Sequence, residues 1–366
     1  MAALLRSRLT DWTVSVPLVA VLILAFTWGR ELPAVGTFVV AAFLAGAVLA
    51  AVHHAEVVAH RVGEPYGSLV LAVAVTVIEV ALIVTLMISG GDKTQALARD
   101  TVFAAVMITC NGILGLSLLI GTLRRQVASF NPEGTGGALA TVITLAALSL
   151  VLPTFTTSRP GPEFSPAQLG FAAAASLALY GLFVLVQTGR HRDYFLPVDS
   201  QGRVIEHEEH AKPPSGRAAL LSLGLLLVAL VAVVGDAKTV SPAIEAGVAA
   251  ANLPQSFVGV VIALLVLLPE TLAAGRAARR DRVQISLNLA LGSAMASIGL
   301  TIPAIALASI WLDGPLMLGL GGTQLVLLTL TAITGVLTVV PGRATLLQAG
   351  AHLVLLASFV FLAASP

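Results

Sequence analysis

Apolar residues in this chain are grouped into long runs that are separated by short polar segments. Eleven such runs occur, at 12–28, 34–54, 67–89, 100–121, 137–154, 166–187, 217–235, 254–275, 284–311, 314–339 and 345–364. At about 1.5 Å per residue, a helix of about 20 residues crosses the hydrocarbon core of a bilayer. The pattern predicts an all-α polytopic membrane protein with about 11 transmembrane helices.

Composition supports a membrane protein and excludes several other classes. The chain is 57% hydrophobic and only 11% charged, too little charge to cover a soluble protein of this size. The first run is not followed by a small-residue cleavage site, so we expect a first span rather than a removable signal peptide. A net charge of +1 gives no sign of nucleic-acid binding, and the single Cys110 excludes an internal disulfide.

Lysine and arginine are distributed unevenly between the two predicted sides of the membrane. Of the 20 in the chain, five fall on one side: Arg30, Lys93, Arg99, Arg159 and Lys238. The remainder fall on the side that holds the N-terminus, and loops rich in lysine and arginine face the cytoplasm. The bias predicts a multi-pass protein of the cell (inner) membrane, with its N-terminus cytoplasmic and its C-terminus on the outer side.

One long hydrophilic segment divides the chain into comparable halves. We expect an N-terminal region and leading helix at 1–33, a first repeat at 34–187, a cytoplasmic acidic loop at 188–216 and a second repeat at 217–366. Five predicted spans in each half give the halves opposite topology. Two inverted five-helix repeats after one leading helix are typical of secondary transporters.

A single carboxylate interrupts one apolar run in each half. Glu79 lies in AVAVTVIEVALIVTLM (72–87), and Glu270 lies in VVIALLVLLPETLAAG (260–275). An ungapped alignment of 64–79 with 255–270 places Glu79 over Glu270. A carboxylate in the hydrocarbon core costs roughly 2.5 kcal/mol or more, so such residues usually mark ion or proton pathways. A protonated glutamate that donates to a backbone carbonyl is the alternative.

Oxygen-bearing side chains accompany both acids and favour a cation site. Pro269 removes a helix hydrogen bond beside Glu270, Asn111 lies in the fourth run, and Ser293 and Ser297 share a face of the ninth. Packing of small residues between helices is the alternative for each hydroxyl. Two ionised carboxylates repel each other, and either protons or a hard cation such as Ca²⁺ relieves the repulsion. This competition predicts an obligatory antiporter without a cofactor, acting on Ca²⁺, Na⁺ or K⁺ and on H⁺, with the lipid bilayer as its other partner.

Two further polar stretches leave alternatives open. In HHAEVVAH (53–60), His53, Glu56 and His60 share a helix face, as in an intramembrane metal-dependent enzyme; an interfacial helix end and a role in regulation or cation access are the other interpretations. The loop residues Glu206, Glu208 and Glu209 are either solvated or attract cations. Asp236 and Glu245 are predicted to be loop charges on the outer side, and Gln324 a helix–helix contact. A passive channel is disfavoured by the paired buried acids.

Two longer motifs resemble the calcium/cation antiporter superfamily, in particular the bacterial ChaA-like sodium/calcium–proton antiporters. They are AHRVGEPYGSLVLAVAVTVIEV (59–80) and LLPETLAAGRAARRDRVQISLNLALGSAMASIGLTIP (267–303). The resemblance implies that Glu79 and Glu270 bind cation and proton in turn, and that CNG (110–112) and LGSAMAS (291–297) are the polar turns. The family usually has Gly-Asn-Ala-x-Glu before each acid, whereas this chain has VTVIE and VLLPE. We therefore expect Thr76 to replace the asparagine in the first repeat, and a site open to Na⁺ or K⁺.

Overall fold

A computed structural model describes residues 11–30, 32–63, 66–90, 94–198, 203, 213–311 and 314–366, without the side chains of 66–69, 71 and 89–90. Within these ranges nine helices are long and apolar enough to cross a membrane, and two shorter apolar helices lie at Trp12–Thr27 and Ala72–Ile88. The predicted all-α polytopic class with about eleven spans is confirmed. Glu206, Glu208 and Glu209 of the acidic loop lie outside the described residues.

The chain forms two compact units, and each takes segments from both halves of the sequence. The first unit contains Met1–Gly91 and His210–Val258, and the second contains Asp92–Glu209 and Gly259–Pro366. This division groups helices by packing, whereas the predicted repeats at 34–187 and 217–366 group them by topology. The repeat boundaries therefore stay a prediction.

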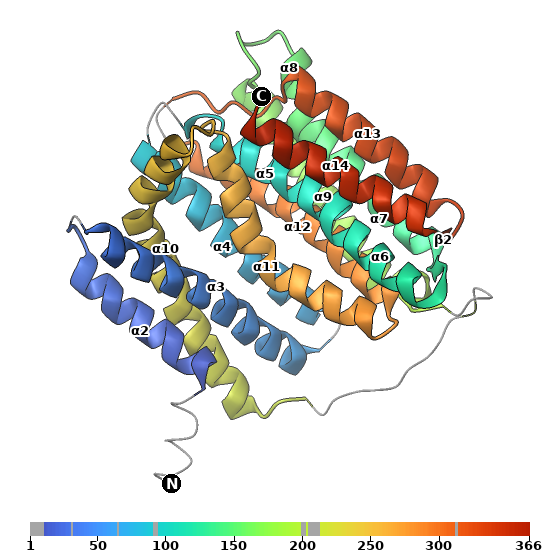
Figure 1. Cartoon of the computed structure of the whole chain (residues 1–366), viewed down its shortest axis with the longest axis horizontal. Coiled ribbons are helices and arrows are strands. Elements are labelled where there is room, and N and C mark those ends of the chain that lie inside the picture. Colours follow the sequence, from blue (N-terminus) through green and yellow to red (C-terminus); the bar gives the residue numbers. More distant parts are fainter. Residues whose placement is uncertain are drawn as a thin grey trace. The chain divides into compact units, whose positions relative to one another are not determined.

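The described part of the first unit consists of four helices, three of which pack around the fourth. They are α2 (Trp12–Thr27), α3 (Ala34–Val62), α4 (Tyr66–Gly90) and α10 (Gly216–Ala250). α3 packs against the other three, and α2 runs beside it in Figure 1. Asp11 caps α2 by accepting from the Thr13 N–H, and Ser215 caps α10 by accepting from the Ala218 N–H. Both helices therefore start close to where the apolar runs begin.

Two helices of the first unit continue well past the predicted ends of their apolar runs. α3 extends to Val62 rather than residue 54, and α10 extends to Ala250 rather than residue 235. Polar residues end an apolar run, but most of them can continue an α-helix, because they keep the backbone N–H that the helical hydrogen bonds need. Asp236 and Glu245 therefore lie inside α10, and their prediction as loop charges was wrong.

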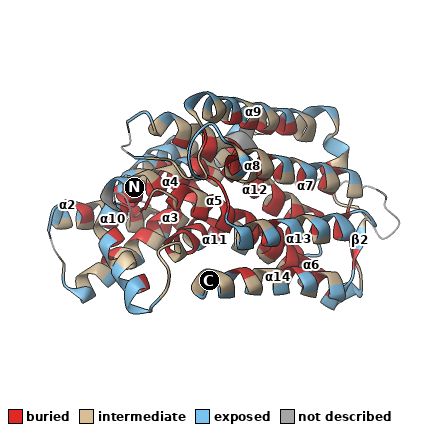
Figure 2. Cartoon of the chain, turned by 90° about the horizontal axis from the view of Figure 1, so that it is seen from above, coloured by how far each residue is buried: buried red, intermediate tan, exposed pale blue. Residues whose placement is uncertain are grey.

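The second unit is built around α12 (Val283–Ala308). Its other segments are α5 (Leu97–Met107), η2 (Ile108–Ile113), α6 (Leu114–Arg125), α7 (Pro132–Ala146), η3 (Ala147–Val151), α8 (Leu152–Phe155), α9 (Pro166–Leu185), η4 (Val186–Arg190), η5 (Arg192–Phe195), α11 (Phe257–Arg279), α13 (Gly322–Val339) and α14 (Leu346–Ala364). α12 packs against α5, η2, α6, α7 and α9. Buried residues are concentrated on α5 and α12 (Figure 2). η2 is a π-helical turn between α5 and α6, and such turns often accompany functional sites.

Short strand pairings fix which loops of the second unit lie at the same end. β1 (Ala128–Ser129), after α6, pairs antiparallel with β2 (Arg343–Ala344), after α13. At the other end Glu163 bridges to Met317, whose N–H donates to the Gln95 carbonyl. The loops that pair at each end of the unit are the ones that the positive charges predict to lie on the same side of the membrane. The absolute orientation in the membrane stays a prediction.

Candidate functional site

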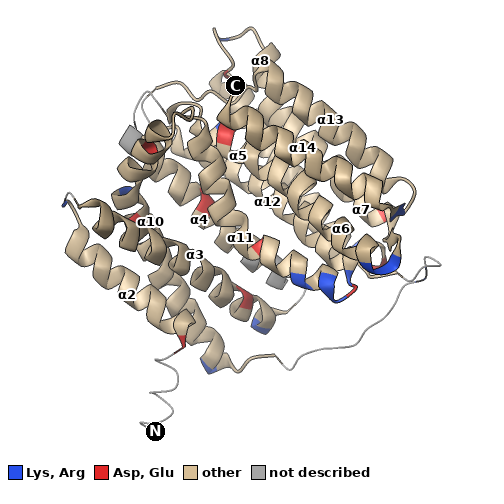
Figure 3. Cartoon of the chain, viewed as in Figure 1, with Lys and Arg blue, Asp and Glu red and all other residues tan. Residues whose placement is uncertain are grey.

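Glu79 lies on the buried face of α4 in the first unit. Its side chain is 3% exposed, and Thr76, one turn earlier, is also buried. Leu82 and Ile83, one turn later, are buried as well, so Glu79 is surrounded along its own helix by apolar groups and one hydroxyl. Glu79 is the one charged residue between positions 66 and 90, and Figure 3 shows α4 uncharged around it. The predicted carboxylate within an apolar helix is present.

Glu270 lies within α11 of the second unit and is half-buried. Pro269 precedes it inside the helix and is buried. Proline has no N–H to donate, so the carbonyl of Leu265 loses its usual helical partner beside this acid. Farther along the helix, the Thr271 hydroxyl donates to the Leu267 carbonyl at 2.7 Å. The basic residues of α11, Arg276 and Arg279, are confined to its last turn.

Asn111 belongs to a buried hydrogen-bond network in the second unit. Its Nδ2 donates to the Thr331 hydroxyl at 2.9 Å, and its Oδ1 lies 3.0 Å from Nδ1 of His352. His352 Nε2 lies 3.1 Å from the Thr338 hydroxyl. Asn111 can only donate through Nδ2 and accept through Oδ1, so His352 Nδ1 carries the proton in this contact. The network joins η2 to α13 and α14, which the sequence did not predict.

The serines of α12 differ in their surroundings. Ser286 is fully buried, contacts the Ser117 hydroxyl and donates to the Ala274 carbonyl at 2.8 Å. Ser297, four residues after Ser293, is 4% exposed, whereas Ser293 is half-buried. The geometry therefore assigns Ser286 to helix packing, while the predicted ligand roles of Ser293 and Ser297 stay predictions.

The histidine face of α3 does not form a metal centre within the part of the chain that is described. His53 and His60 are exposed and Glu56 is half-buried. No group of three His, Cys, Asp or Glu among the described residues could hold a metal ion. The buried member is instead His54, whose Nε2 lies 2.9 Å from the Thr13 carbonyl and whose Nδ1 lies 3.3 Å from the Ser222 hydroxyl. His54 thus joins α2, α3 and α10.

Two buried acids were also missed by the sequence reasoning. Asp100 is 7% exposed and pairs with Arg99 at 2.8 Å, and Gln324 donates to it at 3.4 Å. Gln324 lies in the first turn of α13 and also accepts from the Gly321 N–H, so it caps this helix and contacts another. Asp236 of α10 is fully buried. Hydropathy alone could not distinguish these acids from loop charges, because both lie next to a predicted span end.

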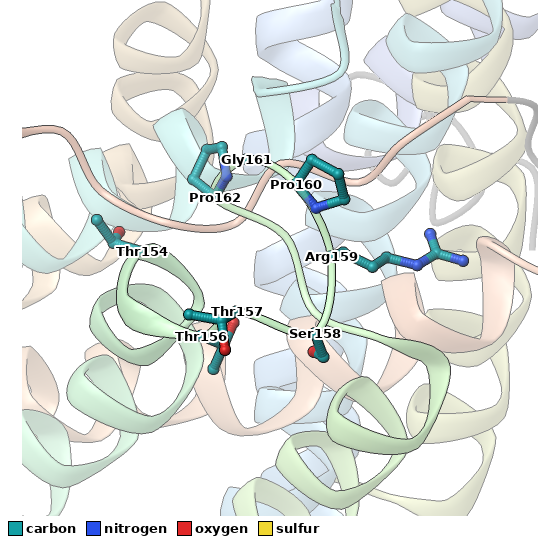
Figure 4. A pocket seen from close by; sticks show the side chains of 8 residues that line it. All are labelled: Thr154, Thr156, Thr157, Ser158, Arg159, Pro160, Gly161 and Pro162. Carbon is teal, nitrogen blue, oxygen red and sulfur yellow. The ribbon is translucent and has the colours of Figure 1, made fainter.

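An open hollow of ≈ 630 Å³ lies in the loop that follows α8 (Figure 4). Its lining residues are Thr154, Thr156, Thr157, Ser158, Arg159, Pro160, Gly161 and Pro162. They include no acid, and Arg159 is 3.7 Å from the Glu163 carboxylate. The hollow contains none of the predicted site residues and is not a candidate cation site.

Comparisons with known proteins identify the family of this chain. A profile of the family described as sodium/calcium exchanger protein matches residues 32–189 and 221–364. The protein y4hA of Sinorhizobium fredii (strain NBRC 101917 / NGR234), which carries the provisional name of an ionic transporter, is 45% identical over 362 residues, covering 97% of this chain and 96% of the relative. The sodium-potassium/proton antiporter ChaA of Escherichia coli (strain K12) is 33% identical over 366 residues, covering 97% and 96%.

The fold has also been seen in a solved structure. The H⁺/Ca²⁺ exchanger CAX matches with a TM-score of 0.70 and 16% identity, covering 96% of this chain and 91% of that chain. At this identity the match shows a shared fold. The relatives are transporters of inorganic cations, so the alternative of a metal-dependent enzyme on the His53 face is set aside. The chain belongs to the sodium/calcium exchanger protein family, and it is a multi-pass membrane antiporter of cations rather than an enzyme.

Proposed function

We propose that the chain exchanges Ca²⁺, and also Na⁺ or K⁺, for H⁺ across the cell membrane, with Glu79 and Glu270 binding cation and protons in turn. The observation that carries the proposal is a carboxylate within an apolar membrane helix of each unit, with Glu79 3% exposed. The relatives support proton coupling, since one is named a sodium-potassium/proton antiporter and another an H⁺/Ca²⁺ exchanger. The two names specify different transported cations, so the cation selectivity of this chain is the part of the proposal that most needs a test.

Electrostatics explains why exchange is coupled. An ionised carboxylate in a low-dielectric environment is unfavourable unless a proton or a cation neutralises it. The form with both glutamates charged and empty is therefore the least stable, and a transporter that reorients only in neutralised forms cannot move one ion without the other. In this proposal protons and the cation compete for the same carboxylate oxygens, so cation affinity falls as the proton concentration rises.

Neutral oxygens complete the proposed cation shell. Hard cations prefer oxygen ligands, and the candidates are the hydroxyls of Thr76, Ser293 and Ser297 and the carbonyl released by Pro269. Asn111 contributes through Oδ1, which keeps a second lone pair after accepting from His352. The cycle needs no cofactor beyond the transported ions.

The orientation follows from the positive charges: the N-terminus lies in the cytoplasm and the C-terminus on the outer side. The exposed His53 and His60 then lie toward the cytoplasmic end of α3, where a role in regulation or cation access is compatible with their exposure. A proton gradient that is directed into the cytoplasm favours cation export in exchange for inward proton movement.

The decisive experiment uses inside-out vesicles with an imposed pH gradient. Ca²⁺, Na⁺, K⁺ or Mg²⁺ is added singly, and a transported cation dissipates the gradient. We expect Glu79→Gln and Glu270→Gln each to lower exchange by roughly 100-fold, because each removes a charge that must be neutralised in every cycle.

Glu133→Gln is the matched control, because this exposed acid lies in the first turn of α7, at the end of its candidate span rather than within it. It should retain wild-type exchange. A gradient that no cation dissipates would reject the antiporter proposal, and so would full activity in both glutamate variants. Raising the pH on the cation side should increase apparent cation affinity, since fewer protons compete.

A further inference from the structure

Asp236 is a buried carboxyl that the proposed exchange mechanism does not use. It lies in α10 of the first unit, and its side chain is 0% exposed. Among the described residues, neither of its carboxyl oxygens has a hydrogen-bond partner. Such a group is uncommon, because an unpartnered buried carboxylate loses its hydration without compensation.

The surroundings of Asp236 on its own helix are apolar and closely packed. One turn away on α10, Ala232, Val233 and Val240 are all buried. The preceding residue, Gly235, packs so closely on Leu24 of α2 that a Cβ there would overlap the leucine side chain. Water therefore cannot hydrate the Asp236 carboxyl from this side while α2 and α10 stay packed together.

Within the described part of the chain, neither a lysine nor an arginine forms an ion pair with Asp236. Lys238, two residues on, is exposed and its Nζ lies 5.3 Å from the centre of the Trp28 ring. The helices packed against α10 are α2, α3 and α4. Asp236 aside, the titratable or charged residues on these helices and on α10 itself are His53, His54, Glu56, His60, Arg61, Tyr66, Glu79, Arg217, Lys238 and Glu245.

Contacts within the unit separate most of these groups from Asp236. His54 contacts Ser222, and Asp236 lies about 21 Å farther along α10 at 1.5 Å per residue. The histidines, Glu56 and the arginines therefore lie toward the opposite end of the unit. Glu245 lies beyond Asp236 and accepts from the Ser241 hydroxyl at 3.4 Å.

Glu79 is the remaining acid among these groups, and it lies between the two ends of the unit, near the middle of α4. α10 and α4 start at the same end, since a Cβ added at Gly216 would lie 4.0 Å from the guanidinium group of Arg61, which shortly precedes α4. Glu79 is about 20 Å along α4 and Asp236 is about 30 Å along α10, at 1.5 Å per residue. Asp236 is therefore roughly 10 Å closer than Glu79 to the membrane face that is predicted to be outer.

We propose that Asp236 is a second proton-binding site, which carries protons between Glu79 and the membrane face at the C-terminal end of α10. In the packed arrangement the carboxyl is neutral and holds its proton, because an isolated charge there costs several kcal/mol. When α10 shifts and admits water, the carboxyl O–H transfers its proton through water to the Glu79 carboxylate, leaving Asp236 ionised until a proton from the outer side restores it. The inference rests on the proposed proton-coupled exchange at Glu79.

The test compares two modes of transport in proteoliposomes that contain Asp236→Asn. The amide has the size of a protonated carboxyl but cannot release a proton. We expect cation/proton exchange to fall roughly tenfold, below the usual effect of removing a direct proton-transfer group. Exchange of radioactive for unlabelled Ca²⁺ needs no proton and should stay at the wild-type rate. Glu245→Gln, on the same helix, should leave both modes unchanged.

Equal loss of both modes would assign Asp236 a purely structural role, and no loss in either would also overturn the proposal. If Asp236→Asn does not fold, infrared spectroscopy of the Glu79→Gln/Glu270→Gln protein provides the second test. A band from a protonated carboxyl should persist there, and its absence would contradict the inference. Full exchange in the single glutamate variants would instead reject the proposed function, whatever Asp236→Asn does.

Discussion

Glu79 and Glu270 occupy matching positions in the two halves of the sequence, but their immediate surroundings differ. Glu79 is almost fully buried, and a threonine lies one turn before it on the same buried face. Glu270 is half-buried and follows a proline that lies inside the same helix. We infer that the two acids differ in role. Glu79 is better suited to hold a proton because it is enclosed, and Glu270 is better suited to bind a hydrated cation because it is more exposed.

The polar turns of the two halves differ in the same way. CNG (110–112) lies in the π-helical turn η2, and its asparagine is fixed by Thr331 and His352. LGSAMAS (291–297) lies in regular α-helix, and its Ser293 is half-buried. Positions that the predicted repeats match thus have different surroundings, and the four tests below probe how far this difference extends to function.

The largest effect is expected where a polar turn is fixed by buried partners. Asn111→Leu keeps the side-chain size but leaves the Nδ1–H of His352 without its acceptor. We expect a loss of about 2–3 kcal/mol in stability, seen as a fall in Tm of roughly 5 °C or more for the detergent-solubilised protein. Ser293→Ala, in the other turn, should change Tm little. Equal Tm values for the two variants would show that both turns are held alike.

The contrast between these turns could not be read from the sequence. The eleven spans were predictable because apolar runs of bilayer length are a strong pattern. The partners of Asn111 depend instead on which face of α14 packs on η2, and His352 gives no sign of this in its own run. Likewise the apolar run before Asp236 ends there, although α10 continues to Ala250. Hydropathy gives the position of a helix in the sequence, whereas burial of one acid depends on its neighbours in space.

The next effect concerns the proline beside Glu270. Pro269→Ala restores an N–H that can bond to the carbonyl of Leu265, so this oxygen is no longer free for a cation. We expect apparent Ca²⁺ affinity to fall roughly tenfold, the equivalent of one strong interaction with a charged group. The measurement is the cation concentration for half-maximal gradient collapse.

Pro242→Ala is the matched control, because this exposed proline also lies inside a helix but in α10, which carries none of the proposed cation ligands. It should leave the affinity near the wild-type value. If both variants weaken binding equally, the proline effect is a general change in helix geometry and not a ligand effect at Glu270.

A smaller effect is expected for the threonine beside Glu79. Thr76→Val keeps the shape of the side chain but removes its hydroxyl, and we expect affinity to fall roughly threefold. Thr76→Ser retains the hydroxyl and should bind cations as the wild type does. The ratio of Ca²⁺ to Na⁺ affinity in both variants shows whether this oxygen affects selectivity. A serine variant as weak as the valine variant would assign Thr76 to packing.

The smallest effect on transport is expected at the histidines of α3, which have no counterpart in the second half. His53 and His60 are exposed, and substitution of exposed residues away from a site usually changes free energies by less than about 0.5 kcal/mol, or roughly twofold in rate. His53→Ala/His60→Ala should therefore exchange cations within this range. His54→Ala removes two buried contacts, to Thr13 and Ser222, and should lower Tm while the surviving folded protein still transports. A large transport defect in the double variant with normal stability would instead make the exposed histidines part of the ion route, and the difference between the two halves would then extend to how cations reach the acids.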